Sequence, residues 1–256
     1  MTSPDLTGVR AVYFDLDDTL CPYWEASKFG LYRAFERCGP VGCSHDDMMH
    51  FWAAAFKEFA PKLKETAWYE RYLKSGNPTR VEQMRRALLH AEIADLELAQ
   101  KLADTYAEER DKALRLFDDA AAVLKTLHGK LPLGLITNGP ADVQRQEIAT
   151  IGVEKYFDHI FIEGELGFGK PNPEVLHRAE LAVGLKPEEL LFVGNSYAQD
   201  MRPSILRGWR TAWVRRPSDL PPTLNMPEHK PEEAPDPDMV VADLREILPS
   251  LGLGSL

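Results

Sequence analysis

Two aspartates, Asp15 and Asp17, are separated by one residue and come directly after a short apolar run at residues 11–14. An uninterrupted apolar run of this length is typical of a strand that is covered on both faces of a parallel sheet. Both carboxylates would then lie at the carboxyl edge of the sheet, where open α/β sheets bind ligands. Like charges this close repel each other unless a cation neutralises them, and hard carboxylate oxygens suit Mg²⁺. The pair therefore indicates a magnesium site, which could also bind phosphate oxygens.

A hydroxyl and an amide follow the next apolar run. Thr137 and Asn138 come directly after residues 131–136, and a helical pattern begins near residue 141. The Thr137 hydroxyl and the free backbone N–H groups before this helix could bind an anion. Such a turn is common, so it indicates an anion-binding site only in combination with the acidic pair.

Lys170 lies in the segment 164–171, which resembles a phosphate-binding P-loop through its Gly-Lys pair. The next residue is Pro171 rather than the Ser or Thr that binds Mg²⁺ in a P-loop, so we reject this motif. Lys170 remains as a positive charge that follows the third strand to the same edge. Asn195 and Asp200 follow the fourth apolar run and add an amide oxygen and a further carboxylate.

The segment around Ser196 also resembles a nucleophile elbow, because it reads G-x-S-x-A. A serine hydrolase of that type places its acid and its histidine later in the chain. The one later histidine, His229, falls in a proline-rich segment at 217–238. This position disfavours the serine hydrolase alternative.

Five short apolar runs alternate with helical patterns along most of the chain. The runs are 11–14, 131–136, 160–162, 190–193 and 211–214, and helical patterns at 118–128, 141–151 and 174–183 precede the second, third and fourth runs. This alternation predicts an α/β fold, a doubly wound parallel sheet of the Rossmann-like kind. A short edge strand at 240–241 and a closing helix at 244–248 are expected after the proline-rich loop.

Residues 22–112 contain helical patterns and no convincing strand. We therefore expect an all-helical domain at 22–112, inserted into an α/β core formed by 1–21 and 113–256.

The formal net charge of −10 argues against a nucleic-acid partner, because binding to phosphate backbones needs a basic face. Three irregularly spaced cysteines, Cys21, Cys38 and Cys43, are expected to be free thiols in a reducing compartment. The amino terminus lacks the pattern of a signal peptide, and no apolar run approaches the length of a membrane span. We expect a cytoplasmic protein with no membrane partner.

The order of these groups resembles that of the haloacid dehalogenase (HAD) superfamily over nearly the whole chain. Residues 15–19 match its first motif, D-x-D-x-T; Thr137 matches the second, Lys170 the third and residues 194–200 the fourth. The helical insertion resembles the cap of the phosphatase-like branch, which also follows the first motif. One departure concerns Asn195, where relatives commonly carry an aspartate that would add charge to the metal site.

This resemblance implies Mg²⁺-dependent hydrolysis of a small-molecule phosphate monoester through an aspartyl-phosphate. Asp15 would be the nucleophile and Asp17 the general acid and base, while Lys170, Thr137 and Asn138 would bind the phosphoryl oxygens. The implied ligands of Mg²⁺ are Asp15, Asp17, Asn195 and Asp200.

Asp17 also bears on the alternatives. Dehalogenase members of the family lack a carboxylate at this position, so Asp17 favours phosphate chemistry, although a phosphomutase remains open. Asn195 supports a catalytically weak protein that only binds phosphate ligands. The candidates for contacting the leaving group are Trp24, Trp68, Tyr69, Arg71 and Arg80.

Overall fold

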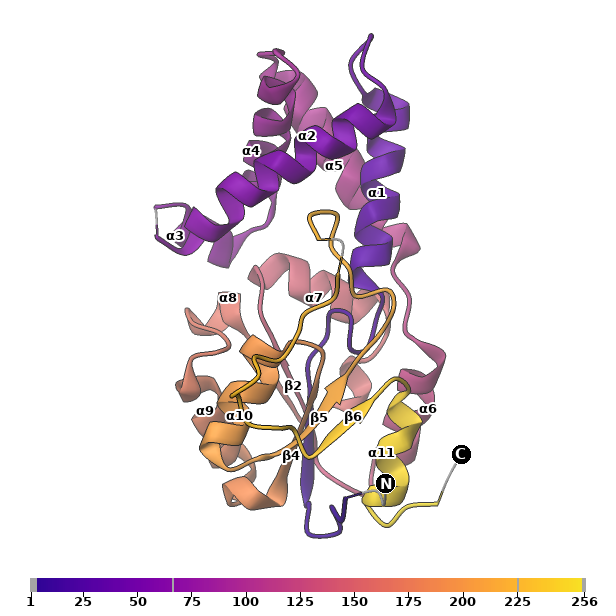
Figure 1. Ribbon diagram of the computed structural model, residues 1–256, viewed down its shortest axis with the longest axis vertical. Coiled ribbons are helices and arrows are strands. Elements are labelled where there is room, and N and C mark those ends of the chain that lie inside the picture. Colours follow the sequence, from indigo (N-terminus) through magenta and orange to yellow (C-terminus); the bar gives the residue numbers. More distant parts are fainter. Residues whose placement is uncertain (1–3, 66, 225, 255–256) are drawn as a thin grey trace.

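A computed structural model describes residues 4–65, 67–224 and 226–254. It contains a six-stranded parallel sheet in the order β3-β2-β1-β4-β5-β6 (Figure 1). The strands are β1 (Ala11–Phe14), β2 (Leu133–Thr137), β3 (His159–Ile162), β4 (Leu190–Gly194), β5 (Arg210–Val214) and β6 (Met239–Val241). The predicted doubly wound α/β fold is confirmed. Strand β1 is the switch point of the topology, because the chain continues to β2 on one side and to β4 on the other.

Strand β2 begins at Leu133, two residues later than the apolar run at 131–136 suggests. Pro132 has no N–H group to donate to the ladder, although its carbonyl accepts a hydrogen bond from Val12. The proline therefore marks the entry to the strand.

Alternate side chains of each strand pack on opposite faces of the sheet. Val12 and Phe14 point toward a core shared with α6 (Asp118–Leu127), α7 (Ala141–Thr150) and α11 (Ile247–Ser250). Ala11 and Tyr13 point the other way, toward α9 (Pro173–Val183) and Trp209 after α10 (Arg202–Arg207). Short helical segments complete the chain: α8 (Glu163–Leu166), η2 (Glu154–Tyr156), η3 (Pro187–Glu189), the π-helical turn η4 (Tyr197–Met201) and η5 (Leu244–Glu246). Both faces of the sheet are thus covered, as the uninterrupted apolar runs require.

The chain between β1 and β2 forms helices that stand over the carboxyl edge of the sheet (Figure 1). They are α1 (Tyr23–Cys38), α2 (His45–Phe59), η1 (Ala60–Glu65), α3 (Trp68–Lys74), α4 (Asn77–His90) and α5 (Leu96–Ala113). We refer to α1–α5 as the helical unit. Side chains of α1, α2, α4 and α5 form a hydrophobic cluster separate from the two sheet cores, with Phe35, Trp52, Met84 and Tyr106 among its members.

The proline-rich segment at 217–238 rises beside the sheet toward the helical unit (Figure 1). Its described residues contain neither helix nor strand. Among the described helices, none combines the length and the apolar character that a membrane crossing needs. The three cysteines are free.

We predict that Gly134→Ala destabilises the fold. A Cβ atom at this position of β2 would overlap the ring of Tyr13, which is fully buried and fixed by a hydrogen bond from its hydroxyl to the Ala179 carbonyl (3.0 Å). Overpacking of this kind costs roughly 1–3 kcal/mol of unfolding free energy, which urea denaturation would measure. Gly8→Ala is the matched control, because a Cβ there meets nothing within 4 Å. Equal stability of the two variants would contradict this account of β2.

Candidate active site

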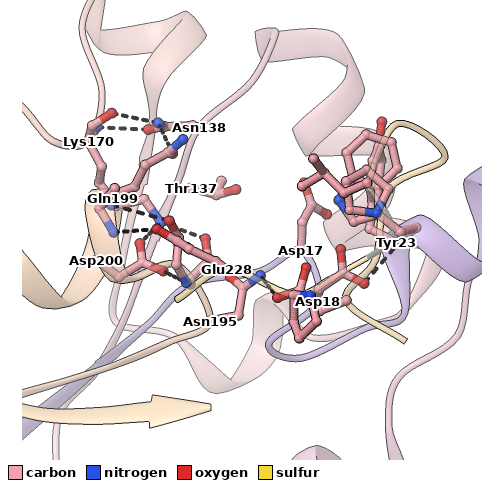
Figure 2. A pocket seen from close by; sticks show the side chains of 18 residues that line it. Asp17, Asp18, Tyr23, Thr137, Asn138, Lys170, Asn195, Gln199, Asp200 and Glu228 are labelled. Carbon is pink, nitrogen blue, oxygen red and sulfur yellow. Dashed lines mark hydrogen bonds and ion pairs between the residues drawn. The ribbon is translucent and has the colours of Figure 1, made fainter. Parts of the chain in front are cut away.

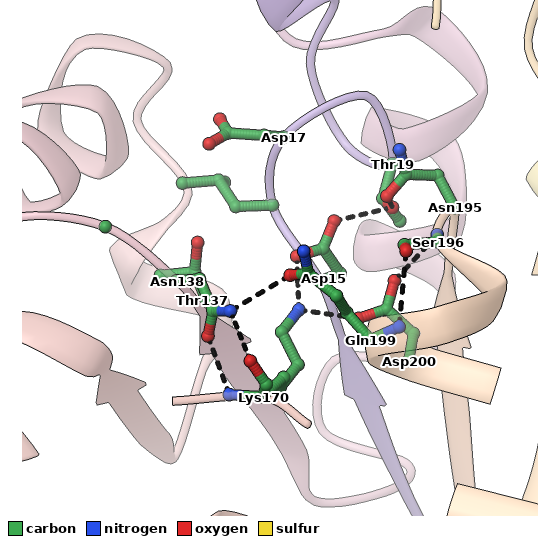
Figure 3. A network of polar contacts seen from close by, with 12 residues as sticks. Asp15, Asp17, Thr19, Thr137, Asn138, Lys170, Asn195, Ser196, Gln199 and Asp200 are labelled. Carbon is green, nitrogen blue, oxygen red and sulfur yellow. Dashed lines mark hydrogen bonds and ion pairs between the residues drawn. The ribbon is translucent and has the colours of Figure 1, made fainter. Parts of the chain in front are cut away.

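Lys170 joins two carboxylates at the carboxyl edge of the sheet (Figure 3). Its Nζ lies 2.6 Å from Asp15 Oδ1 and 2.7 Å from Asp200 Oδ1. All three residues are buried, with 3%, 6% and 1% of their surfaces exposed for Lys170, Asp15 and Asp200. Burial raises the pKa of Asp200 to about 7, against the opposing effect of the Lys170 charge. The ammonium therefore holds together two acids that would otherwise repel each other.

Asn138 fixes the backbone of Lys170. Its side-chain nitrogen donates to the Lys170 carbonyl (2.7 Å) and to Gln199 Oε1 (3.0 Å), and its oxygen accepts from the Lys170 N–H (2.8 Å). The side chain thus binds the loops that follow β2, β3 and β4 to one another. Its backbone N–H, which precedes α7, belongs to the turn expected to bind an anion.

Asp15 has a second partner on the opposite side from Lys170. Its Oδ2 accepts a hydrogen bond from the Thr19 hydroxyl (2.9 Å), which lies 3.4 Å from Asn195 Oδ1. Asn195 donates its side-chain nitrogen to Asp219 Oδ2 (2.9 Å), so its oxygen is turned toward Thr19 and Asp15. Asp219 belongs to the proline-rich loop and was not predicted from the sequence, because a loop pattern does not reveal long-range contacts.

A polar chain connects Thr137 to Asp17 and to the helical unit. The Thr137 hydroxyl donates to Gln144 Oε1 (2.5 Å), and Gln144 Nε2 donates to Asp17 Oδ2 (3.4 Å) and Glu147 Oε2 (2.8 Å). Arg110 of α5 lies 3.4 Å from Glu147, and both are buried. Burial, together with the charges of Glu147 and Asp15, raises the pKa of Asp17 well above its ordinary value. Asp17 is thereby favoured in its protonated form.

The members of this polar chain other than Thr137 and Asp17 were not predicted from the sequence. Gln144 and Glu147 are three residues apart on α7, so they share one helix face, and both are buried. Two buried polar residues on one face of a helix signal a site, but their burial is visible only in the structure.

The proline-rich loop closes one side of the pocket (Figure 2). Glu228 accepts hydrogen bonds from the backbone N–H groups of Tyr197 and Ala198, both at 2.9 Å, at the start of η4. Asp18, in the left-handed region with φ of 58°, accepts from the Trp24 N–H, and its burial raises its pKa to about 8. The pocket has a volume of about 440 Å³. It is lined by the predicted residues Asp15, Asp17, Thr137, Asn138, Lys170, Asn195 and Asp200.

No histidine lines this pocket in the described part of the chain. The Ser196 hydroxyl instead accepts from the Gln199 N–H (3.3 Å) and caps η4. These contacts disfavour Ser196 as a nucleophile.

The oxygen donors of the pocket fit Mg²⁺. Asp15 and Asp200 supply carboxylates and Asn195 an amide oxygen. The described residues hold no group of three or more His, Cys, Asp or Glu side chains arranged as a metal site. Mg²⁺ does not require such a group, because proteins commonly hold it with one or two carboxylates, neutral oxygens and phosphate oxygens of the substrate.

Glu163 connects the helical unit to the loop after β2. It is 1% exposed and accepts hydrogen bonds from Lys64 of η1 (2.6 Å) and from the Tyr69 hydroxyl of α3 (2.8 Å). Its other oxygen accepts from the Gly139 N–H (3.1 Å), two residues after Thr137. Of the candidates for contacting the leaving group, Tyr69 thus binds Glu163, whereas Trp24 and Arg80 line a second cavity next to the site.

Comparisons with known proteins identify relatives of this chain. A family model described as haloacid dehalogenase-like hydrolase matches residues 9–203, and a second HAD-like model matches 167–247. The chain is 31% identical to phosphoserine phosphatase from Thermus thermophilus, over 93% of this chain and 98% of that protein. It is 26% identical to mouse N-acylneuraminate-9-phosphatase, over 88% and 90% of the two chains.

Solved structures share the fold. The magnesium-bound structure of YfnB from Bacillus subtilis superposes with a TM-score of 0.72, at 20% identity over 96% of this chain and 99% of that one. L-2-haloacid dehalogenase from Xanthobacter autotrophicus superposes with a TM-score of 0.67, at 24% identity over 95% and 98%.

We predict that Lys170→Met makes stability strongly dependent on pH. Without the ammonium, Asp200 keeps its buried place beside Asp15 but loses the charge that lowers its pKa, so its pKa in the folded state rises further above that in the unfolded chain. Groups of this kind lower stability as the pH rises from about 4 through the folded-state pKa, because folding then opposes ionisation. The loss relative to the wild type is expected to reach about 3–5 kcal/mol at pH 8 and to be smaller at pH 5.

Urea denaturation at both pH values in the presence of a chelator would measure this dependence. Lys112→Met is the control, since Lys112 is an exposed lysine paired with Glu108. A pH-independent loss in Lys170→Met would contradict the assigned ion cluster.

Proposed function

Because this chain belongs to the haloacid dehalogenase-like hydrolase family, we propose that it hydrolyses a small-molecule phosphate monoester with the help of Mg²⁺. The observation that carries this proposal is the buried contact of Lys170 with Asp15 and Asp200, beside Asp17, whose pKa is raised by burial and by the charge of Glu147. Two similar proteins are phosphatases by name, and the structure of a third holds magnesium.

Asp15 is the proposed nucleophile. One of its carboxylate oxygens forms a bond to phosphorus as the bond from phosphorus to the leaving oxygen breaks, which gives an aspartyl-phosphate. Lys170 and Thr137, with the backbone N–H of Asn138, bind the phosphoryl oxygens and offset their charge. The contacts between Asn138 and Lys170 keep the ammonium in place for this role.

Asp17 is the proposed general acid and base. It gives its proton to the leaving alkoxide in the first step and accepts a proton from water in the second, when water attacks the aspartyl-phosphate and inorganic phosphate is released. The raised pKa of Asp17 favours the protonated carboxyl that the first step needs. Its hydrogen bond from Gln144 positions the carboxyl.

Asp15, the backbone carbonyl of Asp17, Asn195 and Asp200 would hold Mg²⁺. When bound, the ion stabilises negative charge on the phosphoryl oxygens. Asn195 supplies an oxygen without charge, and Asp219 orients that oxygen through the hydrogen bond to the amide nitrogen. The proposed site therefore depends on Asp219 to present Asn195 correctly.

We also propose that the helical unit is a cap domain of residues 22–112, over a core of residues 1–21 and 113–256. Its hydrophobic cluster is separate from the sheet cores, and its contacts with Glu163 lie beside the pocket. A cap in this position excludes water while substrate is bound.

Asp15→Asn tests the nucleophile. The variant is expected to lose Mg²⁺-dependent phosphate release from 4-nitrophenyl phosphate to the level of the background, because an amide cannot form the aspartyl-phosphate. Circular dichroism checks that the fold is retained. The absence of turnover by metal-loaded wild-type protein across a broad panel of phosphate esters would refute the proposed activity.

Asp17→Asn tests the general acid. With an alkyl phosphate the variant should lose about 10²–10⁴-fold in kcat, because the alkoxide leaves poorly without a proton. With 4-nitrophenyl phosphate, whose leaving group is a stable anion, the loss in aspartyl-phosphate formation should be much smaller. Single-turnover kinetics isolates this first step for both substrates. An equal loss with both would show that Asp17 does not protonate the leaving group.

A further inference from the structure

A second cavity of about 660 Å³ lies between the helical unit and the core. It shares Asp17 and Lys170 with the first pocket, so the two are continuous at the reacting groups. Because the proposed general acid lines both, the part of the substrate that leaves as an alcohol must extend toward this second cavity. Its volume is within the range of cavities that bind small organic molecules.

Aromatic side chains of the helical unit form one wall of the cavity. Trp52 and Phe56 of α2 are stacked with their ring centroids 5.1 Å apart, and Trp24 of α1 meets Phe56 edge-on at 6.0 Å. Tyr72 of α3 lines the same space. A wall of this kind favours an apolar, flat ligand over a strongly hydrated one.

Four basic side chains line the cavity, and three of them already have carboxylate partners. Lys64 binds Glu163, Arg110 binds Asp111 and Glu147, and Lys170 binds Asp15 and Asp200.

Arg80 of α4 is the fourth. Among the described residues no carboxylate lies within ion-pair distance of it, and its Nε is buried without a hydrogen-bond partner. The Arg80 charge acts to lower the pKa of Glu147, but that carboxylate is already paired with Arg110. A buried guanidinium nitrogen without a partner is costly, and a carboxylate is the ligand that its planar geometry matches best.

We propose that the second cavity binds a leaving group that combines an apolar ring with a carboxylate, and that Arg80 pairs with this carboxylate. The inference rests on the proposed phosphatase activity, which it extends to a substrate class: phosphate monoesters of carboxylated aromatic alcohols or phenols. The aromatic wall holds the ring, Arg80 binds the acid at one end, and Asp17 faces the ester oxygen at the other.

The test compares phenyl phosphate with the 2-, 3- and 4-carboxyphenyl phosphates. For the wild type, at least one carboxylated isomer is expected to exceed phenyl phosphate in kcat/KM by about tenfold or more, the size of a charge-assisted hydrogen bond. Arg80→Met should remove this preference, measured as the ratio of kcat/KM for the carboxylated isomer to that for phenyl phosphate. Arg80→Lys should restore part of it, because charge without the planar fork still attracts the carboxylate.

Arg85→Met is the matched control on the same helix. Arg85 is paired with Glu82, does not line the cavity and should be replaced without effect on substrate preference. The preference of the wild type among the four esters needs no variant, so the test stands even if Arg80→Met folds poorly.

Calorimetric binding of phenol and the three hydroxybenzoates, the corresponding products, separates this inference from the proposed activity. Binding of one hydroxybenzoate about tenfold tighter than phenol, with loss of that difference in Arg80→Met, supports the inference even where no ester is hydrolysed. If the wild type showed the same kcat/KM for carboxylated and neutral esters, and the same affinity for hydroxybenzoates and phenol, the inference would be overturned. Turnover of phenyl phosphate without any carboxylate preference would overturn the inference and leave the phosphatase proposal intact.

Discussion

The site depends on one buried ammonium between two carboxylates. Asp15 follows strand β1, Asp200 lies in η4 after β4, and Lys170 comes from the loop after β3, so the contact joins segments that are far apart in the sequence. An ion cluster of this kind is costly to desolvate and is retained only where its geometry is well fixed. The parallel sheet provides that geometry, because its strands end at one edge, and Asn138 fixes the backbone of the lysine there.

Polar groups with different roles lie on the two sides of Asp15. On one side, Thr19, Asn195 and Asp219 orient oxygen atoms suited to a hard cation. On the other side, Gln144 connects Thr137 with Asp17, whose pKa is raised. A single short motif after β1 therefore contributes two carboxyl groups with different surroundings, and burial with neighbouring charges raises the pKa of Asp17.

The sheet and the groups at its edge could be predicted from the sequence, because short apolar runs and the residues that follow them are local signals. The strand β1 was predicted at its observed bounds, and β2 begins later than predicted because Pro132 has no N–H group to donate to the ladder. Asp219 and Glu228 could not be predicted, because their roles arise when a proline-rich loop folds back over the pocket. Gln144 and Glu147 were hidden for a related reason: a helical pattern does not show which polar face is buried.

The position of Glu163 has a mechanical consequence. This one buried carboxylate holds Lys64 and Tyr69 above it and the Gly139 backbone below it. Any movement that lifts the helices away from the sheet would leave the buried Glu163 carboxylate with the Gly139 N–H as its one remaining donor among these three, which is energetically unfavourable. Glu163 therefore holds the helical unit to the core. Because the same carboxylate binds the turn that presents Thr137, separation of the helices from the sheet and loosening of that turn are expected to occur together.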